Sequence, residues 1–159
     1  MSTTLQLEFR LELPTTRPLV AISVAMVLAD RGEDYVLGAI ETGAIAWAWD
    51  IRGKSAAARE IRIWRESLLG WLRDPLASLR APARTEDEAE VVGALFPHSR
   101  AEVRGTEVQR MFSCGHSHVM NLIADGLLKA NSEAGPGPTG SPRITRGSVV
   151  GFLIGRRVM

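Results

Sequence analysis

One short segment of the chain gathers side chains that bind metals or form hydrogen bonds. Cys114, His116 and His118 alternate along it, and zinc accepts both thiolate and imidazole ligands. Alternate spacing across a turn does not bring three ligands easily to one tetrahedral centre, and no cysteine pair completes a zinc-binding pattern. The sequence therefore predicts no metal site, and we expect both histidines to be polar residues at the start of a helix.

The residue patterns that accompany catalysis are missing from the sequence. It has no glycine-rich phosphate-binding loop, no nucleophile with a matching base and no paired carboxylates in a recognisable frame. We therefore expect neither enzymatic activity nor a cofactor.

Composition and charge limit the class of protein. The chain has 159 residues, 45% of them hydrophobic, which is enough for one ordinary domain or two small ones. Its net charge is +1, but residues 97–159 hold eight basic and four acidic residues, so positive charge is concentrated there. The longest apolar stretch, Leu19–Ala29, is too short to span a membrane, and no secretory signal is recognisable. A single cysteine agrees with a reducing compartment, so we expect a cytoplasmic protein without a membrane partner.

An internal repeat organises the chain. Leu28–Ile45 aligns without a gap onto Met111–Leu128, with apolar residues or glycines at the matched positions. Arg62–Leu72 aligns onto Arg143–Leu153 at a slightly smaller offset, and the change in offset falls inside a loop. Two blocks in the same order favour a duplicated unit over the chance similarity of two amphipathic helices.

Each copy is predicted to form two short helices joined by a turn, then a hairpin and a closing helix. In the second copy Thr106 and Gln109 form a capping-box pattern, and Ser117 and Ser148 are candidate caps of the later helices. Gly126 fits the left-handed position that ends the middle helix. The first copy has the corresponding candidates at Ser23, Asp34, Gly43 and Ser67.

The hairpins are predicted from short extended runs around loops. In the first copy Ala44–Ile51 is expected to pair with Glu60–Trp64, and in the second Leu127–Ala130 with Arg143–Thr145. The predicted fold is α+β, mainly α with small β wings, in two tandem units. The expected segments are 1–18, a strand-like extension with alternating apolar residues; 19–74, the first unit; 75–104, a linker with a short helix from about Glu86 to Leu95; and 105–159, the second unit.

All four tryptophans lie in the first copy, at positions 47, 49, 64 and 71. We expect them to fill the core between hairpin and helices. The alternation Trp47-Ala48-Trp49 places two indoles on one face of a strand. If that face is exposed, it is a surface for a partner protein or for a second copy of the chain.

In the second copy, Val119–Leu128 has the pattern V-x-x-x-I-x-x-G-x-L, and Arg143–Leu153 follows with R-I-x-x-x-S-V-x-x-F-L. With these two motifs the second copy resembles the excisionase and MerR-like winged helix-turn-helix family. Val36–Ile45 with Arg62–Leu72 is a more diverged relative, and the two copies together cover roughly two thirds of the chain. The resemblance implies that the second helix of a unit enters the major groove of DNA while the hairpin grips the backbone or minor groove.

Site residues follow from the resemblance position by position. The residues that it implies for reading bases are His116, Ser117, His118 and Asn121, of which asparagine suits adenine. Those that it implies for contacts with the DNA backbone are Arg110, Lys129, Arg143 and Arg146 in the second copy and Arg52, Lys54, Arg59, Arg62 and Arg65 in the first.

The first copy departs from this pattern, because Glu33, Asp34 and Glu41 occupy its groove-facing positions and would repel phosphates. We expect it to add backbone grip, dimer contacts or contacts with a partner protein. The implied function is sequence-specific binding of double-stranded DNA in transcriptional control, at the bacterial nucleoid. An excisionase-like factor that directs a recombinase is an alternative within DNA binding, and a protein-interaction scaffold is an alternative of another class.

Overall fold

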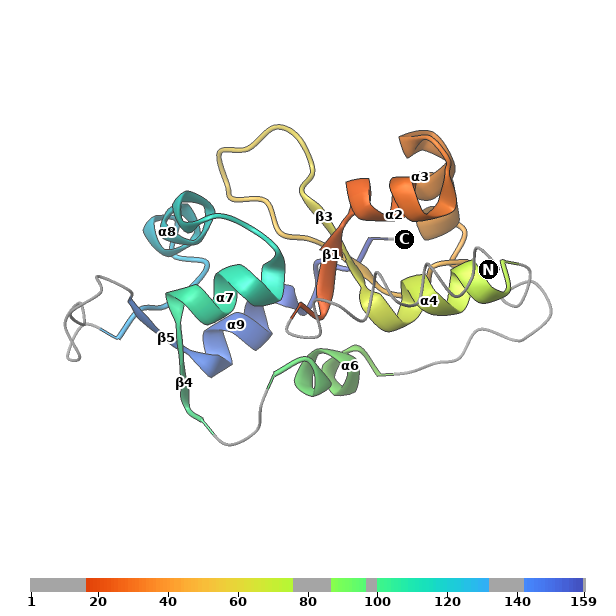
Figure 1. The fold of residues 1–159 in the computed structure, drawn as a ribbon. Coiled ribbons are helices and arrows are strands. Elements are labelled where there is room, and N and C mark those ends of the chain that lie inside the picture. Colours follow the sequence, from red (N-terminus) through yellow and green to blue (C-terminus); the bar gives the residue numbers. More distant parts are fainter. Residues whose placement is uncertain (1–16, 76–86, 97–99, 132–141, 159) are drawn as a thin grey trace.

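The computed structural model describes residues 17–75, 87–96, 100–131 and 142–158 of the chain. Within residues 17–75, a strand is followed by two helices, a pair of strands and a further helix (Figure 1). These elements are β1 (Leu19–Ala21), α2 (Ile22–Ala29), α3 (Glu33–Glu41), β2 (Ala48–Asp50), β3 (Ile61–Trp64) and α4 (Arg65–Arg73).

The second half contains α6 (Glu88–Ala94), β4 (Glu102–Arg104), α7 (Gly105–Phe112), α8 (His116–Ala124), β5 (Arg143–Thr145) and α9 (Arg146–Leu153). The starts of β1, α2 and α3 correspond to those of β4, α7 and α8 at the offset that aligns Leu28 with Met111. The start of α4 corresponds to that of α9 at the offset that aligns Arg62 with Arg143. The strands are short and the helices dominate, so the chain has an α+β fold with small antiparallel sheets.

Among the described residues each half forms its own small antiparallel sheet, and the end of the chain is added to the first of them. The first is antiparallel in the order β1-β3-β2, with Ala48 opposite Ile63, which confirms the predicted pairing of that hairpin. β4 and β5 form a second antiparallel sheet. The end of the chain lies along the outer edge of β2, where Arg157 forms a bridge with Trp49 and the Val158 amide donates to the Ala48 carbonyl at 2.9 Å. The last residues of the second half thus complete the sheet of the first.

Glycines end the middle helices as expected. Gly43 has a φ of 80° and Gly126 one of 77°, in the left-handed region that glycine adopts without strain. The predicted linker helix is also observed: α6 lies within the predicted range. The alternating apolar residues 5–13 and the tip of the second hairpin, 132–141, lie outside the described residues.

The residues predicted to cap the N-termini of the helices were wrong. Helices α2, α4, α7 and α9 follow directly on strands, so the last strand residue takes the N-cap position, and glycines cap α3 and α8. The N-cap residue of α7 is Arg104, whose amide donates to Glu107 Oε2 at 3.2 Å, so Thr106 is not the cap. Two of the serines have another role, because Ser67 Oγ accepts from the Trp47 amide at 3.1 Å and Ser148 Oγ from the Lys129 amide at 3.0 Å. Each serine therefore fastens its helix to the hairpin before it.

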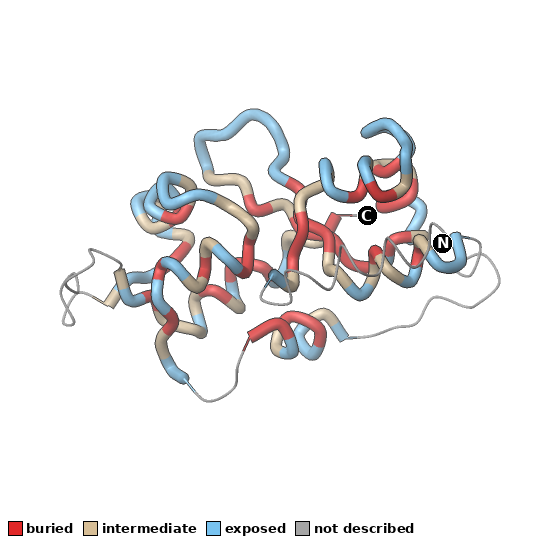
Figure 2. Tube along the Cα trace, in the orientation of Figure 1, coloured by how far each residue is buried: buried red, intermediate tan, exposed pale blue. Residues whose placement is uncertain are grey.

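Two hydrophobic clusters form the core, and one of them crosses the boundary between the halves. Figure 2 shows buried segments in both halves of the chain. One cluster lies mainly within the first half and includes Trp71. The other contains Leu19, Trp47 and Trp49 of the first half together with residues of α6, α7, α8 and α9. Trp47 and Trp49 stack at 5.9 Å between ring centroids and are 2% and 0% exposed. The face that they share is therefore covered by the second half and is not a surface for an external partner.

Candidate nucleic-acid interface

Helix α8 presents a continuous strip of exposed side chains. Val119 and Leu122 are buried and fix the inner side of the helix. The exposed residues, here called the α8 strip, are His116, Ser117, Met120, Asn121 and Ala124. They recur at helical spacing, so they lie along one side of the helix. Its hydroxyl, amide and imidazole groups can form hydrogen bonds with base edges, and its apolar members suit a thymine methyl group.

Met120 was missed by the sequence analysis. It is 39% exposed, and its position one helical turn after Ser117 already placed it on the strip. The predicted site residues on this helix were all polar, and Met120 was not among them.

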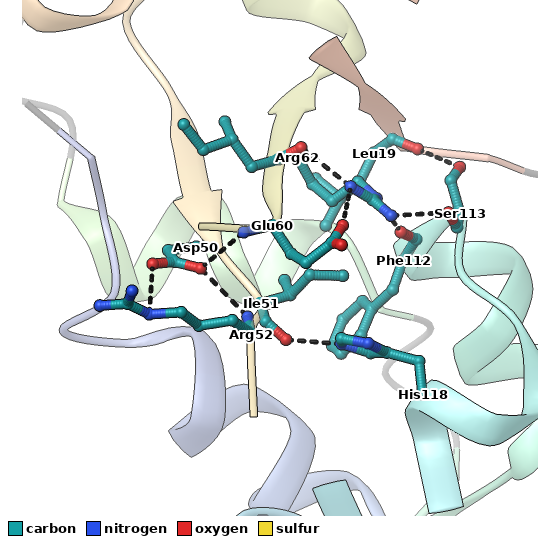
Figure 3. Close-up of polar contacts among 10 residues, drawn as sticks. Leu19, Asp50, Ile51, Arg52, Glu60, Arg62, Phe112, Ser113 and His118 are labelled. Carbon is teal, nitrogen blue, oxygen red and sulfur yellow. Dashed lines mark hydrogen bonds and ion pairs between the residues drawn. The ribbon is translucent and has the colours of Figure 1, made fainter. Parts of the chain in front are cut away.

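His118 differs from the other predicted base-reading residues. It is half-buried, and its Nε2 lies 2.7 Å from the carbonyl oxygen of Ile51 in the first half (Figure 3). The ring is thus engaged within the protein and holds the hairpin loop against α8, so it does not belong to the α8 strip.

The loop between β2 and β3, residues 51–60, lies beside α8. It touches the helix at His118 and again at Asp125, the C-cap of α8, whose Oδ2 accepts from the Lys54 amide at 3.0 Å. The loop base is closed by Asp50, whose Oδ1 accepts from the amides of Arg52 and Glu60, both at 3.1 Å. Figure 1 shows this loop between α8 and α3.

Three of the predicted phosphate-binding residues belong to this loop. Lys54 is exposed. Arg52 contacts Asp50 at 3.1 Å and donates to the Ala57 carbonyl at 3.1 Å. Arg59 lies 3.8 Å from Glu41 of α3 in an exposed ion pair. The backbone of Lys54 therefore lies beside the end of α8, whereas Arg52 is bonded within the loop and Arg59 lies against α3.

Arg62 does not suit its predicted role. It is 9% exposed, and its guanidinium donates to the carbonyls of Phe112 at 2.7 Å and Ser113 at 3.1 Å (Figure 3). The carbonyls that engage its guanidinium come from the end of α7, far away in the sequence, and leave it little exposed for a DNA contact. Ser113 in turn donates to the Leu19 carbonyl at 2.6 Å. The Arg62 side chain therefore links the two halves through hydrogen bonds.

The other basic residues predicted to contact DNA are spread over the molecule. Arg110 on α7 and Lys129 are exposed, and Arg143 lies 4.0 Å from Glu102 with a side chain that is 56% exposed. Arg65 and Arg146 are half-buried at the starts of α4 and α9. These side chains are not brought together at the α8 strip.

Helix α3 occupies the position in the first half that α8 occupies in the second. Its exposed side chains include Glu33, Asp34, Tyr35 and Glu41. The first two lie in the first turn, where negative charge stabilises a helix. This face carries the acidic charge that the sequence predicted.

Cys114 lies in the turn before α8 and is half-buried. Burial raises the pKa of its thiol from 9.0 to about 11, against the opposing influence of Arg62. In the part of the chain that the structure describes, no group of three or more His, Cys, Asp and Glu side chains is arranged to hold a metal ion.

The raised pKa predicts a slowly reacting thiol. An elevation from 9.0 to about 11 lowers the thiolate fraction at pH 8 about a hundredfold relative to an ordinary cysteine, and the thiolate is the nucleophile. We expect iodoacetamide to alkylate the folded protein about a hundredfold more slowly than the urea-unfolded chain. Equal rates by mass spectrometry would contradict the burial of this side chain.

Comparison of the chain with protein-family models, with curated proteins and with solved structures found no match. Within the described ranges, no helix is long and apolar enough to cross a membrane.

Proposed function

We propose that the protein binds double-stranded DNA, with the α8 strip in the major groove and the β2–β3 loop against the phosphate backbone. The observation that carries this proposal is the exposed polar strip of α8 beside a loop with exposed basic residues. Groove-reading helices need exposed hydrogen-bonding groups, and the neighbouring phosphates need cations. The loop is bonded to α8 at His118 and Asp125, so the basic loop and the polar helix are neighbours.

The two halves fit tandem winged helix-turn-helix units, as in the excisionase and MerR-like family. Support comes from matching backbone and side-chain details at equivalent positions of the repeat. Asp30 and Ser113, which the repeat aligns with each other, are both left-handed, with φ of 53° and 48°. Gly43 and Gly126 match in the same way, and Ser67 and Ser148 each bind an amide of the preceding hairpin. In such a unit, α3 and α8 are the second helices of their helix-turn-helix pairs.

We assign different roles in binding to the two units. The α8 strip reads bases, whereas the acidic side chains of α3 repel phosphates. The first unit contributes its loop to DNA binding and leaves α3 for contacts with a protein partner. Control of transcription is the proposed role. An excisionase-like role rests on the same DNA chemistry, and mapping bound sites in the source genome separates promoters from attachment sites.

Binding is tested on labelled duplexes by fluorescence anisotropy between about 50 and 300 mM salt, a range in which several phosphate contacts lower the affinity by orders of magnitude. The Asn121→Ala variant is expected to lose about 1–3 kcal/mol of binding free energy on a duplex selected from a random pool, and little on random duplexes. The reason is that the amide of Asn121 contacts a base edge and not the backbone.

Ser23→Ala is the control, because Ser23 is an exposed polar residue on α2, which is not part of the proposed surface. Its affinity should equal that of the unsubstituted protein. Absence of salt-sensitive binding would exclude the DNA function and leave the protein-interaction scaffold. Equal effects of Asn121→Ala on selected and random duplexes would exclude a base-reading role for this residue.

A further inference from the structure

The β2–β3 loop follows α8 along much of its length. Ile51 meets His118 in the first turn, and Lys54 meets Asp125 at the C-cap. Between these contacts, the backbone of Gly53 is so close that an added Cβ would lie 2.8 Å from Asp125 Oδ2 and 3.9 Å from Leu122. Successive loop residues thus lie against successive turns of the helix. This is a fitted contact between the hairpin of one half and the exposed helix of the other.

The fitted contact lies on a rigid junction. Arg62 donates to two carbonyls at the end of α7, and Ser113 donates to the Leu19 carbonyl in β1. From the segment that follows α9, the Arg156 guanidinium donates to the carbonyls of Asp50 at 3.3 Å and Arg52 at 3.1 Å. The loop base is therefore bonded to the C-terminal extension of α9 while the loop itself is bonded to α8. The two halves cannot rotate independently without breaking these bonds.

We propose that the β2–β3 loop of the first half and the α8 strip form one composite reading surface, and that both contact the same helical turn of DNA. This inference rests on the proposed function. Two independent helix-turn-helix units would instead read half-sites about one turn, or 10 base pairs, apart. In the composite arrangement α8 occupies the major groove and the loop reaches the flanking backbone about half a turn, or 5 base pairs, away.

Within this surface, Gly53 and His118 are positioning residues. They set where the basic loop side chains lie relative to the α8 strip and do not contact DNA themselves. A methyl group at position 53 separates the loop from Asp125, because Oδ2 can move aside only by giving up its hydrogen bond with the Lys54 amide. Lys54 is the residue that the fitted contact places for DNA, since its amide is bonded and its side chain is exposed.

Hydroxyl-radical footprinting on the selected duplex, combined with anisotropy, tests the inference. The unsubstituted protein is expected to protect one continuous segment of DNA. Its centre is covered by the α8 strip, and its flank, within half a turn of the centre, is covered by the β2–β3 loop. In the Gly53→Ala and Lys54→Ala variants, protection of the flank should be lost and protection of the centre should remain. The affinity for the duplex should fall on the order of tenfold. His118→Ala should act like Gly53→Ala without adding an atom that could clash.

Gly70→Ala is the matched control, because a Cβ at this exposed position of α4 meets no atom within 4 Å. It should keep both footprint and affinity. Thermal melting of every variant shows whether a lost footprint comes from unfolding or from displacement of the loop. The footprint of the unsubstituted protein tests the inference without any substitution. Two protected segments a full turn apart, or a flank unchanged in Gly53→Ala, His118→Ala and Lys54→Ala alike, would overturn the composite surface but leave DNA binding intact. No binding by the unsubstituted protein would overturn both.

Discussion

The Trp49→Ala variant is expected to lose about 3–5 kcal/mol of unfolding free energy, as large aromatic-to-alanine changes in a core do. Trp49 is 0% exposed and belongs to the cluster that joins both halves. Its Nε1 also donates to Glu88 Oε1 of α6 at 3.3 Å, and the same oxygen accepts from the Gly155 amide. The substitution therefore leaves a cavity and an incompletely paired carboxylate where three segments meet.

Urea denaturation followed by far-ultraviolet circular dichroism measures this loss. Trp49→Phe is the control: it keeps a ring in the cavity and removes the hydrogen bond, so its loss should be smaller. Because the cluster is shared, we expect one cooperative transition in which both halves unfold together. Two separate transitions, of which Trp49→Ala moves only one, would mean that the halves fold as independent domains.

Arg62→Ala is expected to lower the free energy of unfolding by about 2–4 kcal/mol. The carbonyls of Phe112 and Ser113 lose charge-assisted hydrogen bonds, and each buried acceptor left unpaired costs about 1–3 kcal/mol. Arg62→Lys keeps the charge but not the planar set of donors that reaches both carbonyls, so its loss should be intermediate.

The matched control is Arg59→Ala, in the β2–β3 loop. The ion pair of Arg59 with Glu41 is exposed, at side-chain exposures of 44% and 52%, and exposed pairs contribute at most about 1 kcal/mol. Chemical denaturation of the three variants measures their free energies of unfolding and so ranks their losses of stability. Similar stability of Arg62→Ala and Arg59→Ala would contradict the role of Arg62 as a bond between the halves.

These expectations concern contacts that the sequence did not reveal, whereas much of the local structure could be predicted. Helical periodicity identified the buried side of α8 through Val119 and Leu122, and Gly43 and Gly126 identified where helices end. Such features depend on residues within one or two turns of each other. The offset of the repeat also held for whole elements, because each copy repeats the same local pattern.

The candidate site was predictable only in part. The exposed positions of His116, Ser117 and Asn121 follow from the same periodicity that buries their neighbours. The resemblance to the winged-helix family implied the same role for His118. Only the tertiary structure shows that a carbonyl 67 residues earlier in the chain engages its ring.

Local sequence patterns determined the helices, the turns and the polar character of the α8 strip, since short-range backbone and burial preferences fix them. The tertiary structure decided which polar groups are left for a partner. Arg62 is withdrawn from solvent by carbonyls 50 and 51 residues away, and Trp49 is covered by α6 and by the end of the chain. Hydrogen-bond partners and burial at such separations depend on how the two halves pack, and a periodic pattern within either half carries no information about that packing.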